Sequence, residues 1–142
     1  MKTNQENELL NNWLTITTIH VRIANELEST LQEKYNLSLK EFYVLYFLSQ
    51  TNDKKLRLQQ LQEMLGLSQS AISRLVGRLE AKNCEALQRH ICEDDRRGIY
   101  TCLTEKGEEK LQKSLETFQE ILSAFFSKGD LKNELQSLVD KL

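Results

Sequence analysis

The chain has 142 residues, of which 39% are hydrophobic and 28% are charged, and its formal net charge is −2. This length fits one compact unit, so we expect residues 1–142 to form a single domain. No stretch approaches the roughly 20 apolar residues of a membrane-spanning helix, and the polar beginning does not resemble a signal peptide. We therefore expect a cytoplasmic protein with no membrane partner.

The charges are distributed unevenly along the chain. Residues 37–103 contain ten basic and eight acidic side chains, whereas the two ends together contain nine and thirteen. A negative total charge weakens nonspecific attraction to phosphates. The basic side chains are concentrated in the centre, which makes the centre the better candidate for a nucleic-acid contact.

Helical periodicity dominates the first third of the chain. A helix is predicted over about residues 8–35, because apolar side chains recur there at helical spacing. A second helix is predicted over residues 39–51, and it is apolar nearly all round, which indicates burial. The stripe of the first helix contains Trp13, Ile16, His20, Ile23 and Leu27.

The segment 56–83 predicts two helices joined by a short turn. Gly66 stands where the first helix needs a left-handed residue at its end, and Ser68 is the expected N-cap of the second helix. Such a pair is typical of a helix-turn-helix, which places its second helix in a DNA groove. The second helix is expected to bury Ile72, Leu75, Val76 and Leu79 and to expose Gln69, Ser70, Ser73, Arg74 and Arg78.

Beyond residue 83 the apolar pattern alternates, which predicts two strands. Between them the sequence EDDRRG at residues 93–98 forms a charged tip. A charged hairpin directly after such a helical pair is typical of a wing, whose arginines suit the negative potential of the minor groove. Leu87, Arg89 and Ile91 would share one face of the first strand, and Ile99, Thr101 and Leu103 one face of the second.

Both features also have plainer explanations. Amphipathic helical hairpins with a glycine stop and a serine cap are common in bundles that bind nothing, and charge is common at solvated hairpin tips. The charged hairpin directly follows the helical pair, and this order favours DNA binding.

Two more helices are predicted after the hairpin, separated by Gly129 with Asp130 as a possible cap. Their apolar side chains alternate at intervals of three and four, which is typical of a helix-packing seam. A chain of this size has a limited core of its own, so we expect the helices of both ends to pack against a second copy. Packing within one chain is the alternative. The two seams comprise Leu111, Leu115, Phe118, Leu122 and Phe125, then Leu131, Leu135, Leu138 and Leu142.

Two segments resemble the signature of the MarR (multiple-antibiotic-resistance regulator) family. They are SQSAISRLVGRLE at residues 68–80 and DDRRGIYTCLTEKG at residues 94–107. The resemblance implies a mainly α fold with a small β-hairpin wing. A winged helix-turn-helix at 37–103 would lie between dimerisation helices at 1–36 and 104–142. It also implies a transcription regulator, expected to be a repressor, that binds a pseudo-palindromic operator as a homodimer.

The resemblance assigns roles to individual residues as well. The second helix would enter the major groove and the wing the minor groove, while Asp95 would orient an arginine without touching DNA. A longer segment between residues 84 and 93 than the family usually has leaves open which wing arginine is at the tip. The DNA-binding residues would be Ser68, Gln69, Ser70, Ser73, Arg74 and Arg78 in the helix and Arg96 and Arg97 in the wing.

Two residues depart from the family pattern. Asn83 replaces a usual glycine after the second helix, which is tolerable because asparagine enters the left-handed region more readily than most residues. Gly77 lies inside that helix, where it costs about 1 kcal/mol of helix stability relative to alanine.

Members of the family often bind a small phenolic or lipophilic effector between the two lobes. The side chains that would line such a pocket here are aromatic, and aromatic residues in a buried helix are more often plain core. The candidates are Trp13, His20, Tyr43 and Tyr46.

Three cysteines, Cys84, Cys92 and Cys102, fall in or beside the hairpin. Oxidation of one would shift the wing, with Arg89 or His90 as the positive group that favours a thiolate. The alternative is that cysteine fills the strands as a small apolar residue. In an alternating hairpin, Cys92 and Cys102 do not face each other, so no bridge between them is expected.

Catalysis and metal binding find little support in the sequence. It has two histidines, no nucleophile motif and no glycine-rich phosphate loop, and its cysteines lack zinc-site spacing. We expect no enzyme activity, no metal and no cofactor. The remaining alternative to a DNA-binding regulator is a winged-helix module that binds a protein partner and no DNA.

Overall fold

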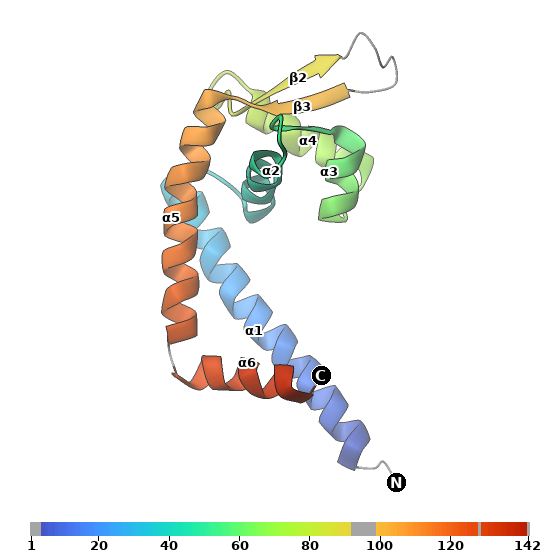
Figure 1. Cartoon of the computed structure of the whole chain (residues 1–142), viewed down its shortest axis with the longest axis vertical. Coiled ribbons are helices and arrows are strands. Elements are labelled where there is room, and N and C mark those ends of the chain that lie inside the picture. The colour runs from blue at the N-terminus through green and yellow to red at the C-terminus, as the bar shows by residue number, and fades with distance from the viewer. Residues whose placement is uncertain (1–3, 92–98, 128, 142) are drawn as a thin grey trace.

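A computed structural model describes residues 4–91, 99–127 and 129–141 (Figure 1). It is mainly helical with a small three-stranded antiparallel sheet, so the predicted fold class is confirmed. Among the described residues, none of the helices has the length and apolar content to span a membrane. The elements are α1 (Asn4–Tyr35), α2 (Leu39–Ser49), β1 (Lys55–Arg57), α3 (Leu58–Leu65), α4 (Gln69–Glu80), β2 (Leu87–Ile91), β3 (Ile99–Leu103), α5 (Glu105–Ser127) and α6 (Gly129–Lys141).

The sheet and the helices α2, α3 and α4 gather at one end of the molecule, while the long helices α1 and α5 run away from them (Figure 1). At the opposite end α6 crosses from α5 to α1. A small apolar cluster joins these three helices, with Ile19 of α1 and Leu138 of α6 buried in it. The predicted C-terminal helices therefore exist, and α6 packs against its own chain through this cluster.

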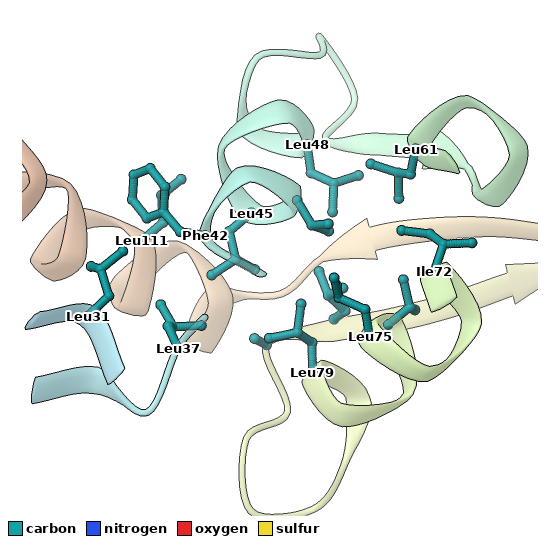
Figure 2. Close-up of a cluster of buried hydrophobic side chains, with 14 residues drawn as sticks. Leu31, Leu37, Phe42, Leu45, Leu48, Leu61, Ile72, Leu75, Leu79 and Leu111 are labelled. Carbon is teal, nitrogen blue, oxygen red and sulfur yellow. The ribbon is translucent and has the colours of Figure 1, made fainter. Parts of the chain in front are cut away.

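The main core is built around α2, as Figure 2 shows. Val44, Leu45 and Leu48 are fully buried, and side chains from α1, α3, α4 and α5 meet them. Burial of α2 was predicted from its apolar composition. Its Tyr46 nevertheless remains 37% exposed, so the helix is covered on most sides and open on one.

Local capping sets the ends of the short helices. Ser38 and Glu41 form a capping box at α2, in which each side chain accepts a hydrogen bond from the other residue's backbone N–H at 3.1 and 2.8 Å. Helix α3 ends at Gly66, whose φ is 65°. Ser68 caps α4 by accepting a hydrogen bond from the Ala71 N–H at 3.2 Å. The predicted stop and cap of the helix-turn-helix are both confirmed.

The strand order in the sheet is β1-β3-β2. In β2 and β3 the partners are Leu87 with Leu103, Arg89 with Thr101 and Ile91 with Ile99. The two strands are confirmed, and this register puts the two predicted trios on the same face of the hairpin. Strand β1, which pairs with β3, was not predicted. Its three residues are too few to show an alternating pattern before α3 begins.

The left-handed turn after α4 is at a different residue from the one expected. Glu85 has a φ of 52°, and Asn83 is not among the residues with positive φ. The reason is that Ala81 already leaves the helix in an extended conformation and its carbonyl accepts hydrogen bonds from the N–H groups of Cys84 and Glu85. The chain therefore reverses two residues later, directly before β2.

Gly107 has a packing role at the start of α5. A Cβ atom at this position would collide with the carbonyl oxygen of Ala86. Thr104 fixes this approach, because its hydroxyl accepts a hydrogen bond from the Gly107 N–H at 3.0 Å and donates to the Glu85 carbonyl at 2.6 Å. Thr104 and Gly107, which belong to the segment that resembles the MarR signature, thus join α5 to the residues directly before β2.

Candidate nucleic-acid interface

Helix α4 has two contrasting faces. Ile72 and Val76 are fully buried in the core, and Leu75 and Leu79 are nearly so. Ser73 is half-buried, and the remaining predicted contact residues of the helix-turn-helix are exposed. The exposed set consists of Ser68, Gln69, Ser70, Arg74 and Arg78.

Arg78 lies near the N-terminal end of α2. Its Nε is 3.6 Å from the Oε2 of Glu41, whose side chain is only 9% exposed, whereas the arginine side chain is 65% exposed. Because the arginine end of this pair lies largely in solvent, its guanidinium is available to an anionic partner.

Arg89 connects the predicted wing to α4. Its Nε donates to the Glu80 carboxylate at 2.5 Å, and its Nη2 donates to the Ser73 carbonyl at 3.4 Å. Both partners belong to α4 and Arg89 to β2, so the strand is tied to the helix along its side. The sequence suggested Arg89 as a neighbour for a cysteine, and the structure gives it these partners instead.

The wing tip is not part of the described chain. Asp95, Arg96 and Arg97 fall within residues 92–98, and so does Cys92. The described strands reach the pair Ile91 and Ile99 on either side of this segment.

Lys55, Arg57 and Tyr100 form a group on the outer face of the sheet that the sequence did not predict. Pairing of β1 with β3 brings them together, because Arg57 is the partner of Tyr100 and Lys55 the partner of Cys102. These pairings depend on a strand too short to be read from the sequence, which is why the group was missed.

The four residues predicted to line one effector pocket are divided by the structure. Tyr43 and Tyr46 line a cavity of about 720 Å³ between α2 and α5, whose other walls include Phe42, Phe47, Leu115 and Phe118. His20 lies instead in a second cleft of about 670 Å³, lined also by Tyr43, Lys40, Arg74 and Arg78. Trp13 lines neither of them and is 64% exposed on α1.

Tyr43 forms the wall between these two cavities. Its burial raises the pKa of its phenol above the ordinary value, and the negative charge of Glu28 raises it further. The hydroxyl therefore stays protonated at neutral pH and is able to donate a hydrogen bond to a ligand.

The two described cysteines differ in their surroundings. The Sγ of Cys84 is 3.7 Å from the Nζ of Lys110, so lysine is its positive neighbour. Burial is the main cause that raises the pKa of the Cys102 thiol, and Asp53 adds to this while Lys55 opposes it. Cys102 thus remains a thiol, and of these two Cys84 is the better candidate for oxidation. In the part of the chain that the structure describes, no cluster of metal-binding side chains occurs.

Comparison with known proteins identifies the family. The family model of the transcriptional regulator SarA/Rot matches residues 26–114, which include the whole helix-turn-helix and all three strands. No curated protein matches the chain significantly.

Several solved structures share the fold over nearly the whole chain. AbsC, a MarR family transcriptional regulator from Streptomyces coelicolor, is 26% identical with a TM-score of 0.77, and the match covers 97% of this chain and 92% of AbsC. The transcriptional regulator BldR from Sulfolobus solfataricus is 25% identical with a TM-score of 0.75, and both chains are covered fully. A second MarR family regulator from Streptomyces coelicolor, solved in complex with DNA, is 22% identical with a TM-score of 0.78 over 99% of this chain and 87% of that one. The chain belongs to the SarA/Rot family of transcriptional regulators and has the winged-helix fold of the MarR family.

Proposed function

We propose that the protein is a sequence-specific DNA-binding repressor that places α4 in the major groove and its wing arginines in the minor groove. The observation that carries this proposal is the outer face of α4, where Arg74 and Arg78 stand with serine and glutamine in a chain of net charge −2. Guanidinium, hydroxyl and amide groups are the side chains used to contact base edges and phosphates. The DNA complex of the fold relative from Streptomyces coelicolor supports the same use of the fold.

The operator is pseudo-palindromic in this proposal, because the protein acts as a homodimer. Helix α1 supports dimerisation, since its first half exposes large apolar side chains that this chain does not cover. A contiguous apolar surface of this kind marks an interaction site. A two-fold dimer presents two α4 helices about one DNA turn apart. The exposed side chains are Leu9, Leu10, Trp13, Leu14 and Ile16.

Selection of binding sites from a random duplex pool tests the proposal. A recovered inverted repeat, with half-sites separated by about one helical turn, is the expected result. A mobility-shift assay across salt concentrations is the second measurement. If the chain retains no duplex in either assay, the proposed function is wrong and the alternative of a protein-binding module is favoured.

We propose as well that a small-molecule effector binds in the 720 Å³ cavity beside Tyr43 and Tyr46. Its volume falls in the range of about 300 to 1,000 Å³ typical of small-molecule sites, and its walls are mostly apolar, with aromatic and aliphatic side chains together. A lipophilic or phenolic compound fits such walls. Since the cavity joins α2 to α5, a bound compound would alter the position of the DNA-binding elements relative to the long helices.

A substitution that fills the cavity tests whether the effector binds there. Substituted phenols should release wild-type protein from its operator, whereas Leu122→Trp, which places a large side chain in the cavity, should bind the operator and ignore the phenols. The exposed Glu120→Trp variant on the same helix is the control and should respond normally. If Leu122→Trp responds like the control, the effector does not occupy this cavity.

A further inference from the structure

Two cationic side chains surround one aromatic ring on the outer face of the sheet. The Nζ of Lys55 lies 5.0 Å and the Cζ of Arg57 lies 5.4 Å from the centre of the Tyr100 ring. The Nε of Arg57 also donates a hydrogen bond to the Tyr100 hydroxyl at 3.2 Å. The ring and its hydroxyl thereby hold the guanidinium in one orientation while Arg57 itself stays exposed.

A third polar side chain lies in the same row of the sheet as Arg57 and Tyr100. The strand register places Arg57, Tyr100 and His90 in one row across the three strands, and His90 is exposed. Asp53 lies 3.9 Å from the Lys55 ammonium and offsets part of that charge. Arg57 and His90 extend the row toward β2, on the same side of the sheet.

The position of the cluster in the chain is specific. Arg57 is the N-cap of α3, the first helix of the helix-turn-helix, and Tyr100 is the second residue of β3, directly after the wing segment. The hydrogen bond between them therefore joins the start of the helix-turn-helix to the base of the wing hairpin.

DNA geometry makes this junction important. A major groove and the neighbouring minor groove are separated by one sugar-phosphate strand. A protein that occupies both grooves must pass this strand where its helix-turn-helix meets its wing. In this protein that place carries the cluster of Lys55, Arg57 and Tyr100.

We propose that Arg57, oriented by Tyr100 and assisted by Lys55, binds a phosphate of the strand between the two grooves. This inference rests on the proposed function and extends the DNA contact to residues outside α4 and the wing tip. A planar guanidinium matches a phosphate, and its fixed orientation reduces the entropy lost on binding. The contact contributes affinity and no base preference, because phosphates carry no sequence information.

The dependence of log affinity on log salt concentration measures the contact. Full-length Arg57→Gln should bind the selected operator and a random duplex more weakly by the same factor, and its salt slope should fall by about 0.9 for each phosphate that the variant no longer neutralises. Arg57→Lys keeps the charge and should retain most of the slope. Tyr100→Phe removes only the orienting hydroxyl and should weaken binding less than Arg57→Gln.

Lys113→Gln is the matched control, since it removes one positive charge from an exposed lysine of α5. If Arg57→Gln changes the slope no more than Lys113→Gln does, the phosphate contact is wrong even though operator binding persists. If the wild-type protein binds no duplex, the proposed function fails and this inference fails with it.

Ethylation of individual operator phosphates gives a second measurement that does not require an Arg57 variant. With wild-type protein, modification of a phosphate between the major-groove and minor-groove contacts should prevent binding. A Tyr100→Phe protein should be less sensitive at that phosphate and unchanged elsewhere. Interference confined to phosphates facing α4 would contradict the inference.

Discussion

Arg74 is the side chain on which operator recognition is expected to depend most. It is exposed on the outer face of α4, whose opposite face is fixed in the core by Ile72 and Val76. Because the helix is anchored on its buried side, the outer side chains begin from defined backbone positions. A side chain in such a position gives up less freedom on binding than one on a mobile loop.

Replacement of Arg74 by alanine should weaken operator binding by about 1 to 3 kcal/mol per half-site when the contact is bidentate to guanine. Titration of the operator with the variant, whose fold is verified by circular dichroism, measures the change in affinity. Lys82→Ala, which removes an exposed cation beyond the end of α4, is the control and should bind nearly normally. Unchanged affinity of the Arg74→Ala dimer would rule out the role given to Arg74.

Two glycines should respond in opposite directions to alanine. Gly107→Ala should lower the free energy of unfolding by about 1 to 3 kcal/mol, because its Cβ would meet the Ala86 carbonyl oxygen, which belongs to the backbone and cannot rotate away. Gly77→Ala should raise it by about 1 kcal/mol, since nothing lies within 4 Å of its Cβ and alanine favours the helix. Urea unfolding of both variants checks this. A Gly107→Ala protein as stable as Gly77→Ala would contradict the packing role of Gly107.

At the scale of elements, α4 and the wing strands form one connected unit. Arg89 of β2 joins Glu80 and the Ser73 carbonyl of α4, so the strand and the helix keep a fixed relative position. The side chains of Arg89 and Glu80 are 33% and 25% exposed, so solvent screens this ion pair less than a surface pair. The pair therefore helps to hold the strand against the helix. A groove-binding helix and a wing held together in this way would reach DNA as a single surface.

The wing should contribute differently from α4. Replacing both Arg96 and Arg97 by alanine should weaken binding at many sequences alike and flatten the dependence of log affinity on log salt, because minor-groove arginines respond to potential and groove width. The preference for the selected operator over variant operators should survive. Binding assays on several duplexes across salt concentrations test this. A double variant that keeps its salt slope and loses only base preference would show that the wing assignment is wrong.

At the scale of the whole molecule, its two ends differ in how well their apolar side chains are covered. The end with the sheet has a core of its own, assembled from five helices and the strands. The beginning of α1 has no such cover, and Trp13, the single tryptophan of the chain, is exposed there. This asymmetry is what a DNA-binding end and a dimerising end would have.

Trp13→Glu should convert the homodimer to a monomer, because a carboxylate would be buried in an apolar interface. Light scattering should then give the mass of one chain, and affinity for a two-half-site operator should fall strongly. Asn11→Glu, on another side of α1, is the control and should remain dimeric. In the wild-type protein, tryptophan emission should shift to longer wavelength on dilution. A wild-type protein that is monomeric at micromolar concentration would contradict the dimer and the palindrome together.

The sequence by itself determined the elements whose signals are local. Helix α4 was predicted with its cap at Ser68 and its buried stripe, because capping and helical spacing act within a few residues. The same holds for the stop at Gly66 and for the alternation that predicted the two wing strands. The family resemblance was carried by these same segments.

Tertiary structure alone decided the features that depend on residues far apart in the chain. Strand β1 exists because β3 offers its edge, and this pairing brings Arg57 to Tyr100, 43 residues away. Gly107 is constrained by a carbonyl of the segment that leads into β2, and the left-handed turn falls at Glu85 because Ala81 leaves α4 in an extended conformation. Of the predicted effector residues, the tyrosines and His20 line different cavities and Trp13 lines neither of them. The positions of α1 and α2 relative to α5 follow from core packing, which no local periodicity encodes.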